Sequence, residues 1–119
     1  MAKTNNDIGT TVAKVRIYET TSPLLEAMQA ELRELSKKKP EATLSKSKVT
    51  LINRLLCDIR ELLKDEDNSK YLDILDDESL PQYSDVVLIV SQYVAAMHAF
   101  ESRYKAQDPI TYSREWALR

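Results

Sequence analysis

Residues 12–18 read Val-Ala-Lys-Val-Arg-Ile-Tyr, and this stretch decides which fold the sequence predicts. Apolar residues alternate along it with Lys14, Arg16 and Tyr18. A period of two with β-branched residues predicts a half-buried β-strand. No other segment gives a clear strand signal, and a lone strand leaves its backbone N–H and C=O groups unpaired. We therefore expect it to pair with the same strand of a second copy about a two-fold axis.

The composition favours helices for the rest of the chain. The sequence has 119 residues with one Gly and four Pro, and 43% of the residues are hydrophobic and 30% charged. So few turn-forming residues argue against a sheet-rich fold, and the length suits one domain or two small modules. We expect a mainly α protein: an N-terminal ribbon-helix-helix unit, with one strand and two helices per chain in an intertwined dimer, followed by a helical oligomerisation module.

Three helices are predicted after the strand. Ser22-Pro23 opens the first, because Ser is a good N-cap and Pro suits the first helical position, and Pro40 closes it. The second covers roughly residues 46–66 and has a wide apolar face. Ser84 caps the third, which runs to about residue 106 and is apolar nearly all round, a pattern typical of burial in a bundle or between chains.

The expected organisation is a flexible tail at 1–10, a DNA-binding domain at 11–66, an oligomerisation or partner module at 67–108 and a C-terminal tail at 109–119. The last ten residues, with Trp116, are expected to form a short docking helix or to fray. Heptad-like steps along the third helix predict a tetramer surface made of Val86, Val90, Tyr93, Met97, Phe100 and Tyr104.

Charge is distributed unevenly along the chain. Residues 1–54 hold ten Lys/Arg and six Asp/Glu, whereas residues 55–119 hold seven and thirteen. A basic first half and an acidic second half suggest two tasks, one of them against a polyanion. Ordinary solvated surface on both halves is the alternative.

Few residues are suited to catalysis or metal binding. One His, one Cys and one Gly exclude a Cys/His metal cage, a disulfide framework and a glycine-rich phosphate loop. His98 is interpreted as a partly buried structural residue and Cys57 as a surface thiol. Asp65–Asp76 has EF-hand ligand spacing, but Lys70 stands where Gly permits the sharp turn, which favours an acidic linker over a calcium site. We expect no enzyme, no cofactor and no metal.

The longest apolar run is far too short to cross a bilayer. It covers only Val86–Val90, whereas a spanning helix needs about 20 residues. The N-terminus also lacks the apolar core of a signal peptide. We expect a cytoplasmic protein with no membrane insertion.

The strand–helix–helix order predicts a DNA interface. Lys14 and Arg16 project from one face of a ribbon, and such a ribbon enters the major groove, where Arg reads guanine. The second helix starts at Ser45-Lys46-Ser47, whose free N–H groups, hydroxyls and ammonium suit a phosphate. A plain helical bundle with an N-terminal arm is the alternative.

Residues 12–56 resemble a ribbon-helix-helix DNA-binding domain, through VAKVRIY, the Ser22-Pro23 helix start and LSKSKVTLINRLL. The layout is similar to that of the TraM-like conjugation proteins of F-like plasmids, in which a helical oligomerisation module follows the DNA-binding domain. The resemblance implies sequence-specific binding near a plasmid transfer origin, as a relaxosome accessory protein that meets a coupling protein. It also implies phosphate contacts at Ser45, Lys46 and Ser47, and base contacts at Lys14, Arg16, Tyr18 and Val12.

Two other functions remain open. One is an antitoxin or transcriptional repressor with the same DNA-binding end and a C-terminal segment that neutralises a toxin. The other is a helical interaction protein that binds no nucleic acid. The partners expected across these readings are double-stranded DNA, further copies of the chain, and a coupling protein, relaxase or toxin.

Overall fold

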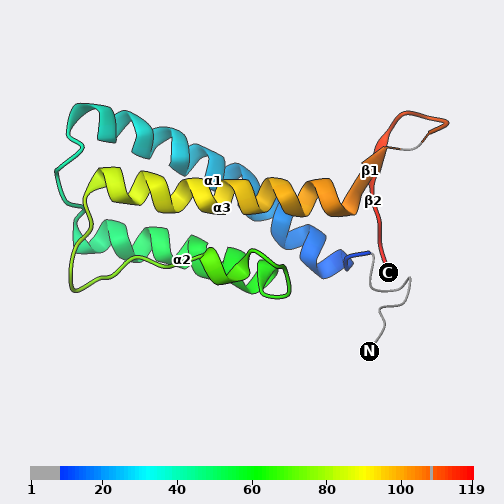
Figure 1. The fold of residues 1–119 in the computed structure, drawn as a ribbon, viewed down its shortest axis with the longest axis horizontal. Helices are drawn as coiled ribbons and strands as arrows, with labels where there is room; N and C mark the ends of the chain where they lie inside the picture. The colour runs from blue at the N-terminus through cyan, green and yellow to red at the C-terminus, as the bar shows by residue number, and fades with distance from the viewer. Residues whose placement is uncertain (1–8, 108) are drawn as a thin grey trace.

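The computed structural model describes residues 9–107 and 109–119. Three α-helices pack side by side and a small hairpin follows them (Figure 1). The prediction of a mainly α fold is confirmed, and the prediction of an N-terminal strand is wrong. The elements are α1 (Val12–Lys38), α2 (Lys46–Leu63), a short 3-10 helix (Ser69–Tyr71), α3 (Tyr83–Tyr104), β1 (Lys105–Gln107) and β2 (Arg114–Trp116).

The first two helices are antiparallel, and the last two are parallel. Figure 1 shows α1 running opposite to α2, and α3 running in the same direction as α2. The connection between α2 and α3 therefore returns along the length of the bundle and carries the 3-10 helix on its way. As a result, the end of α1 and the starts of α2 and α3 meet at one end of the molecule.

Residues 12–18 form the first two turns of α1. Thr11 caps this helix, since its Oγ1 accepts a hydrogen bond from the Lys14 N–H at 3.2 Å. Val15 and Tyr18, three residues apart, are 8% and 7% exposed and lie on the same side of the helix. A helix also pairs its interior backbone groups within one chain, which a lone strand does not. The period of two in this segment is therefore coincidental, and over residues 9–107 and 109–119 the chain has no N-terminal strand of the kind a ribbon-helix-helix unit requires.

Ser22-Pro23 lies inside α1 and does not begin a helix. A proline here removes one backbone donor and hinders the carbonyl four residues earlier, which bends a helix. Pro23 is on the exposed side, while Leu25 and Leu32 are buried in the core. In Figure 1 the first half of α1 is more steeply inclined than its second half. The packing of the inner face keeps the helix continuous across the proline.

The second and third helices are confirmed with small changes at their ends. α2 begins at Lys46, as expected, and the Ser45 Oγ accepts from the Lys48 N–H at 3.3 Å. It ends at Leu63 instead of about residue 66. α3 begins at Tyr83, one residue before the predicted cap. Strong helical periodicity and a good N-cap are local signals, which is why both helices could be found from the sequence.

One hydrophobic core joins all three helices, and residues on both sides of the expected domain boundary contribute to it. Leu72 and Leu75 of the connection are also buried there. The six residues expected to form a tetramer surface are each 7% exposed or less in this core. A tetramer built on them would require the bundle to open. They are Val86, Val90, Tyr93, Met97, Phe100 and Tyr104.

The C-terminal residues neither form the expected docking helix nor fray, because Arg114–Trp116 is one strand of a hairpin. β1 and β2 are antiparallel, with Lys105 opposite Trp116. The Trp116 ring packs against Tyr18, with centroids 5.1 Å apart, and against Phe100 at 5.8 Å. The hairpin is thus fixed to α1 and α3 by an aromatic cluster.

The two ends of the described chain meet beside this hairpin. The Thr10 N–H donates to the Ala117 carbonyl at 2.8 Å, and the Arg119 N–H donates to the Thr10 carbonyl at 3.0 Å. A Cβ on Gly9 would lie 2.8 Å from the Ala117 oxygen, so this close approach requires glycine. Among the residues described, no helix is long and apolar enough to cross a membrane.

Three buried tyrosines predict a loss of stability at alkaline pH. Burial raises the pKa of Tyr18, Tyr93 and Tyr104 above the ordinary value of 10.0. Above that pH the unfolded chain loses protons that the folded chain keeps, so the free energy of unfolding falls as pH rises. The slope reaches about 1.4 kcal/mol per pH unit for each fully shifted group.

Urea unfolding from about pH 9 to about pH 11 measures this slope. Tyr93→Phe removes the most deeply buried of the three hydroxyls, and its stability should fall less steeply with pH than that of the wild type. Equal slopes for the two proteins would show that Tyr93 titrates normally.

Candidate functional site

The residues expected to contact bases do not form one surface. Residues two apart on a helix point about 200° away from each other, so the alternation that would align them on a strand separates them here. Val12 is 54% exposed, whereas the Tyr18 ring is buried against Phe100. Arg16 is exposed in the groove between α1 and α2. Residues 12–18 therefore do not form the strand that was expected to enter the major groove.

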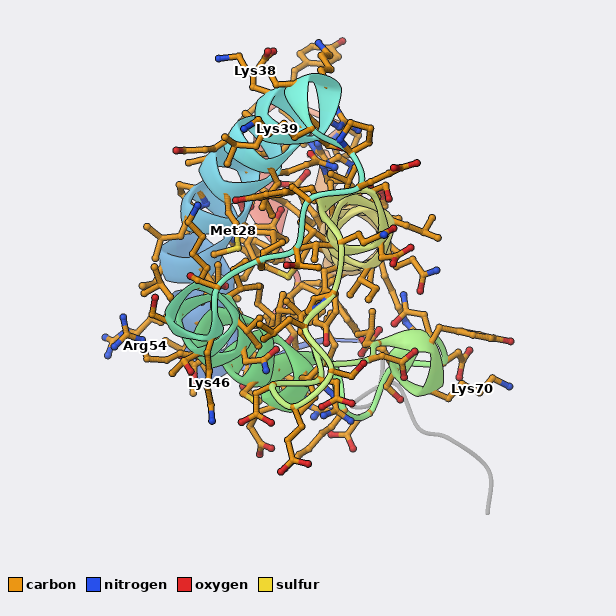
Figure 2. The ribbon with its side chains drawn as sticks, turned by 90° about the vertical axis from the view of Figure 1, so that its left-hand side faces the viewer. Met28, Lys38, Lys39, Lys46, Arg54 and Lys70 are labelled. Carbon is orange, nitrogen blue, oxygen red and sulfur yellow. The ribbon has the colours of Figure 1, made fainter. Side chains whose placement is uncertain are left out.

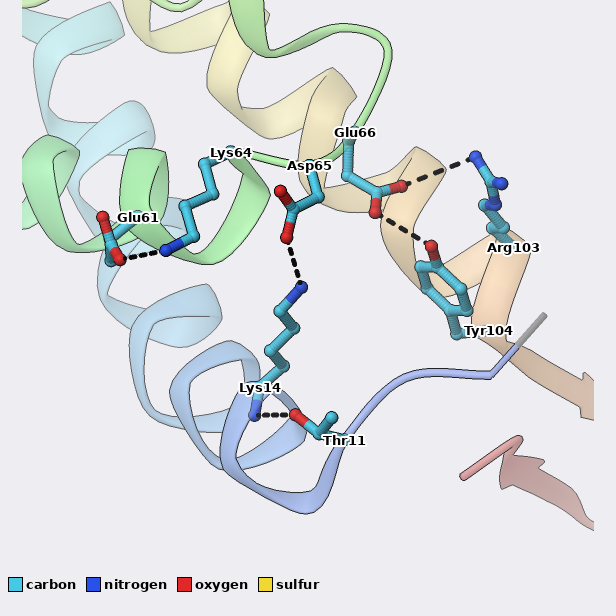
Figure 3. Close-up of polar contacts among 8 residues, drawn as sticks. All are labelled: Thr11, Lys14, Glu61, Lys64, Asp65, Glu66, Arg103 and Tyr104. Carbon is cyan, nitrogen blue, oxygen red and sulfur yellow. Dashed lines mark hydrogen bonds and ion pairs between the residues drawn. The ribbon is translucent and has the colours of Figure 1, made fainter. Parts of the chain in front are cut away.

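Lys14, the remaining member of that set, forms an ion pair with another residue of the same chain. Its Nζ lies 3.3 Å from the Asp65 Oδ2 and its side chain is 20% exposed (Figure 3). Glu66, next in the chain, accepts a hydrogen bond from the Tyr104 hydroxyl at 2.9 Å and lies 3.8 Å from an Arg103 nitrogen. These contacts join the start of α1 and the end of α3 to the residues that follow α2.

The residues expected to contact phosphate do lie together and are exposed. Ser45, Lys46 and Ser47 form the N-terminus of α2. The two serine hydroxyls are 3.2 Å apart, and the first turn contains no acidic residue. The positive end of the helix dipole is therefore not offset by a carboxylate of its own helix.

The lysines at the end of α1, which were not predicted as part of a site, join this surface. Lys37 and Lys38 form the last turn and Lys39 is the C-cap. Residues 37–48 contain five lysines and a single acidic residue, Glu41. We call these five lysines the basic end. The run of lysines is visible in the sequence, but the favourable interaction of cations with the C-terminal end of a helix dipole is enough to explain it. The basic end consists of Lys37, Lys38, Lys39, Lys46 and Lys48.

The charges of the basic end are spread over a surface. Figure 2 shows Lys38 and Lys39 toward one side of this end and Lys46, with Arg54, toward the other. Two of the five lysines have contacts inside the chain: Lys37 with Glu34 at 3.4 Å, and Lys48 with the Tyr83 hydroxyl at 2.8 Å. Separated charges of one sign suit a polymer with repeating negative groups better than a small anion.

The connection between α2 and α3 carries the opposite charge. Residues 65–78 contain seven acidic residues against Lys70 alone, and we call them the acidic connection. Asn53 of α2 holds it in place: its Nδ2 donates to the Leu75 carbonyl and its Oδ1 accepts from the Leu75 N–H, both at 2.8 Å. No group of three or more His, Cys, Asp or Glu side chains within the described ranges is arranged to hold a metal ion.

The two remaining reactive side chains are both on the surface. His98 is 64% exposed and its Nε2 lies 3.9 Å from a Glu26 oxygen, so its interpretation as a partly buried residue is wrong. Cys57 is free and exposed on α2, as interpreted. The packing of α3 in the bundle leaves His98 on the outer side of the helix. The periodicity of the sequence did not determine that His98 would lie on that side.

Comparison of the chain with protein-family models, curated proteins and solved structures finds no match. The resemblance to ribbon-helix-helix proteins therefore depends on the quoted residues alone. Of these, the segment 12–18 adopts a conformation that such a domain does not have, whereas the start of α2 keeps the expected one.

Proposed function

We propose that this protein is a non-enzymatic DNA-binding protein that holds the phosphate backbone of a duplex with its basic end. One observation supports this above all: five lysines against one carboxylate in residues 37–48, around the exposed N-terminus of α2. Lysines facing phosphates release counterions and supply most of the affinity of sequence-independent binding. The N–H groups of Lys46 and Ser47 add donors that a phosphate oxygen accepts.

The distribution of charge favours one orientation of the proposed duplex. The acidic connection would repel phosphates, and Asn53 fixes it on α2. A duplex is therefore expected to contact the basic end on the side of α2 that faces away from Leu75 and its acidic neighbours. Backbone contacts position a protein without reading the sequence, so we expect weak sequence preference from this surface. Specific binding at a transfer origin remains a proposal from the resemblance, and relaxase genes beside this one would support it.

The double variant Lys38→Ala/Lys46→Ala tests the proposal. Fluorescence anisotropy with a labelled duplex at low salt should show at least about a tenfold weaker affinity, because two phosphate contacts are lost. The slope of log K against log salt should become shallower by about two units. Both residues are exposed, so the fold should be unchanged by circular dichroism.

Lys64→Ala/Lys70→Ala is the matched control. It removes the same charge from exposed positions outside the basic end, and its affinity should equal that of the wild type. Equal weakening by both doubles would mean that net charge alone drives binding. Failure of the wild type to bind at low salt would remove the proposal.

A helical interaction protein without a nucleic-acid role is the second candidate. Leu24 of α1 and Leu51 of α2 are 56% and 55% exposed, and Leu51 lines the groove between these helices together with Met28 and Leu35. Exposed apolar side chains gathered at a groove are typical of protein contact surfaces. If the wild type does not bind DNA, this candidate becomes the better one.

A further inference from the structure

The helices α1 and α2 leave a shallow apolar groove that no described part of the chain covers. Its floor and rims include Met28 and Leu35 of α1 and Leu51 of α2. Leu24 is exposed and Leu55 is half-buried. They lie four residues from Met28 and Leu51, and this helical spacing places them on the same faces, where they extend the apolar surface. Figure 2 shows Met28 between the two helices and Arg54 outside α2 on the same side of the molecule. We call this surface the α1–α2 face.

The charges beside this groove change sign along its length. Toward the end of α1, Glu31 on α1 and Lys48 on α2 flank it. A second hollow lies between the same two helices toward the start of α1, and there the signs are exchanged: Arg16 is on α1, and Asp58 and Glu61 are on α2. Between these helices, an acidic and a basic position therefore face each other at both ends, and the helix that carries the acidic one changes from α1 to α2.

Such a pattern is complementary to itself. A second copy turned by 180° about an axis parallel to the helices places α1 on the α2 of that copy. Glu31 then faces a lysine, and Arg16 faces carboxylates. A two-fold axis across the helices instead places α1 on α1, which brings Arg16 to Glu31 of the second copy and Lys48 to Asp58. Opposite charges meet in both arrangements, around an apolar centre.

We propose that the α1–α2 face is the contact surface of a homodimer. The charge pattern selects this occupant, because a partner with one sign of charge would be repelled by half of the face. The alternation in residues 12–18 predicted a dimer through an N-terminal strand; in the dimer proposed here a helical face takes the place of that strand. The dimer does not depend on DNA binding, and its test contains no nucleic acid.

Leu51→Asp tests the dimer by sedimentation equilibrium of the full chain over a wide range of concentration. The wild type should approach twice the chain mass of 13.7 kDa, and the variant should stay at the chain mass. We expect at least about a hundredfold weaker association, since a symmetric interface receives the buried charge twice. Leu51 is 55% exposed in the single chain, so the fold should tolerate the change.

Leu88→Asp is the matched control, because Leu88 is an equally exposed leucine, at 63%, on α3. It should dimerise as the wild type does. A wild type that remains monomeric at the highest concentration overturns the proposal. So does a result in which Leu88→Asp dissociates the dimer and Leu51→Asp does not, because that places the interface on α3.

Charge-reversal variants distinguish the two possible two-fold axes, one parallel to the helices and one across them. Arg16→Glu should weaken the dimer in either arrangement. Adding Glu31→Arg should restore it if α1 lies on α1, whereas adding Asp58→Arg and Glu61→Arg should restore it if α1 lies on α2. Restoration by neither would show that these charges do not pair across an interface, which contradicts the complementarity on which the dimer is argued.

Discussion

Replacing Phe100 by alanine should lower the free energy of unfolding by about 3–5 kcal/mol, the usual cost of deleting a fully buried aromatic ring. Phe100 is 1% exposed. Its ring centroid lies 5.7 Å from that of Tyr18, 4.9 Å from that of Tyr104 and 5.8 Å from that of Trp116. The deletion therefore leaves a cavity among three rings that hold α1, α3 and the hairpin together.

Urea unfolding measures this loss, and tryptophan emission gives a second readout because Trp116 is the single tryptophan. In Phe100→Ala its emission should shift toward the red as water reaches the hairpin. Leu88→Ala, at an exposed position of the same helix, should change stability by less than about 0.5 kcal/mol. A loss below about 1 kcal/mol for Phe100→Ala would mean that the aromatic cluster does not form.

Replacing Asn53 by alanine should lower the free energy of unfolding by about 2–3 kcal/mol. The change leaves the Leu75 N–H and carbonyl without their partners, and an unpaired buried polar group costs about 1–3 kcal/mol. The side chains of Leu72 and Leu75, which are 2% and 4% exposed, are held in the core by the same anchor. We therefore expect the acidic connection to become sensitive to protease before the helices do.

Asn53→Asp separates the two hydrogen bonds. It keeps an acceptor for the Leu75 N–H but has no donor for the carbonyl, and it adds a charge near the acidic connection, so its stability should also fall. Thr50→Ala is the control, because Thr50 is exposed and its hydroxyl bonds only to the Lys46 carbonyl of its own helix. If Asn53→Ala were as stable as that control, the anchoring role would be wrong.

The helices that could be predicted have strong local signals. The apolar face of α2 and its Ser45 cap lie within one stretch of sequence, and α3 repeats its apolar residues over five turns. Residues 12–18 are too few to separate a period of two from a helical one. Contacts between residues far apart in the sequence favour the helix over the strand, because Tyr18 packs on Phe100 and Trp116. No local pattern contains that information.

The candidate site could be predicted only in part for a related reason. Ser45, Lys46 and Ser47 were found because a helix start is visible in sequence. Lys38 joins them through the turn that brings the end of α1 to the start of α2, which is a feature of the folded chain. The expected base-contacting residues were placed by assuming a strand, and a helix sends Lys14 to Asp65 and Tyr18 into the core.

The hydrogen bonds between Thr10 and the C-terminal residues fix the position of the C-terminus, and that position has a practical consequence. Figure 1 shows the C-terminus at the end of the bundle opposite the turn between α1 and α2. A reporter domain or a surface tether attached after Arg119 would therefore project away from Lys38 and Lys46. An immobilised protein would present those lysines to the solution, which suits single-molecule and biosensor work.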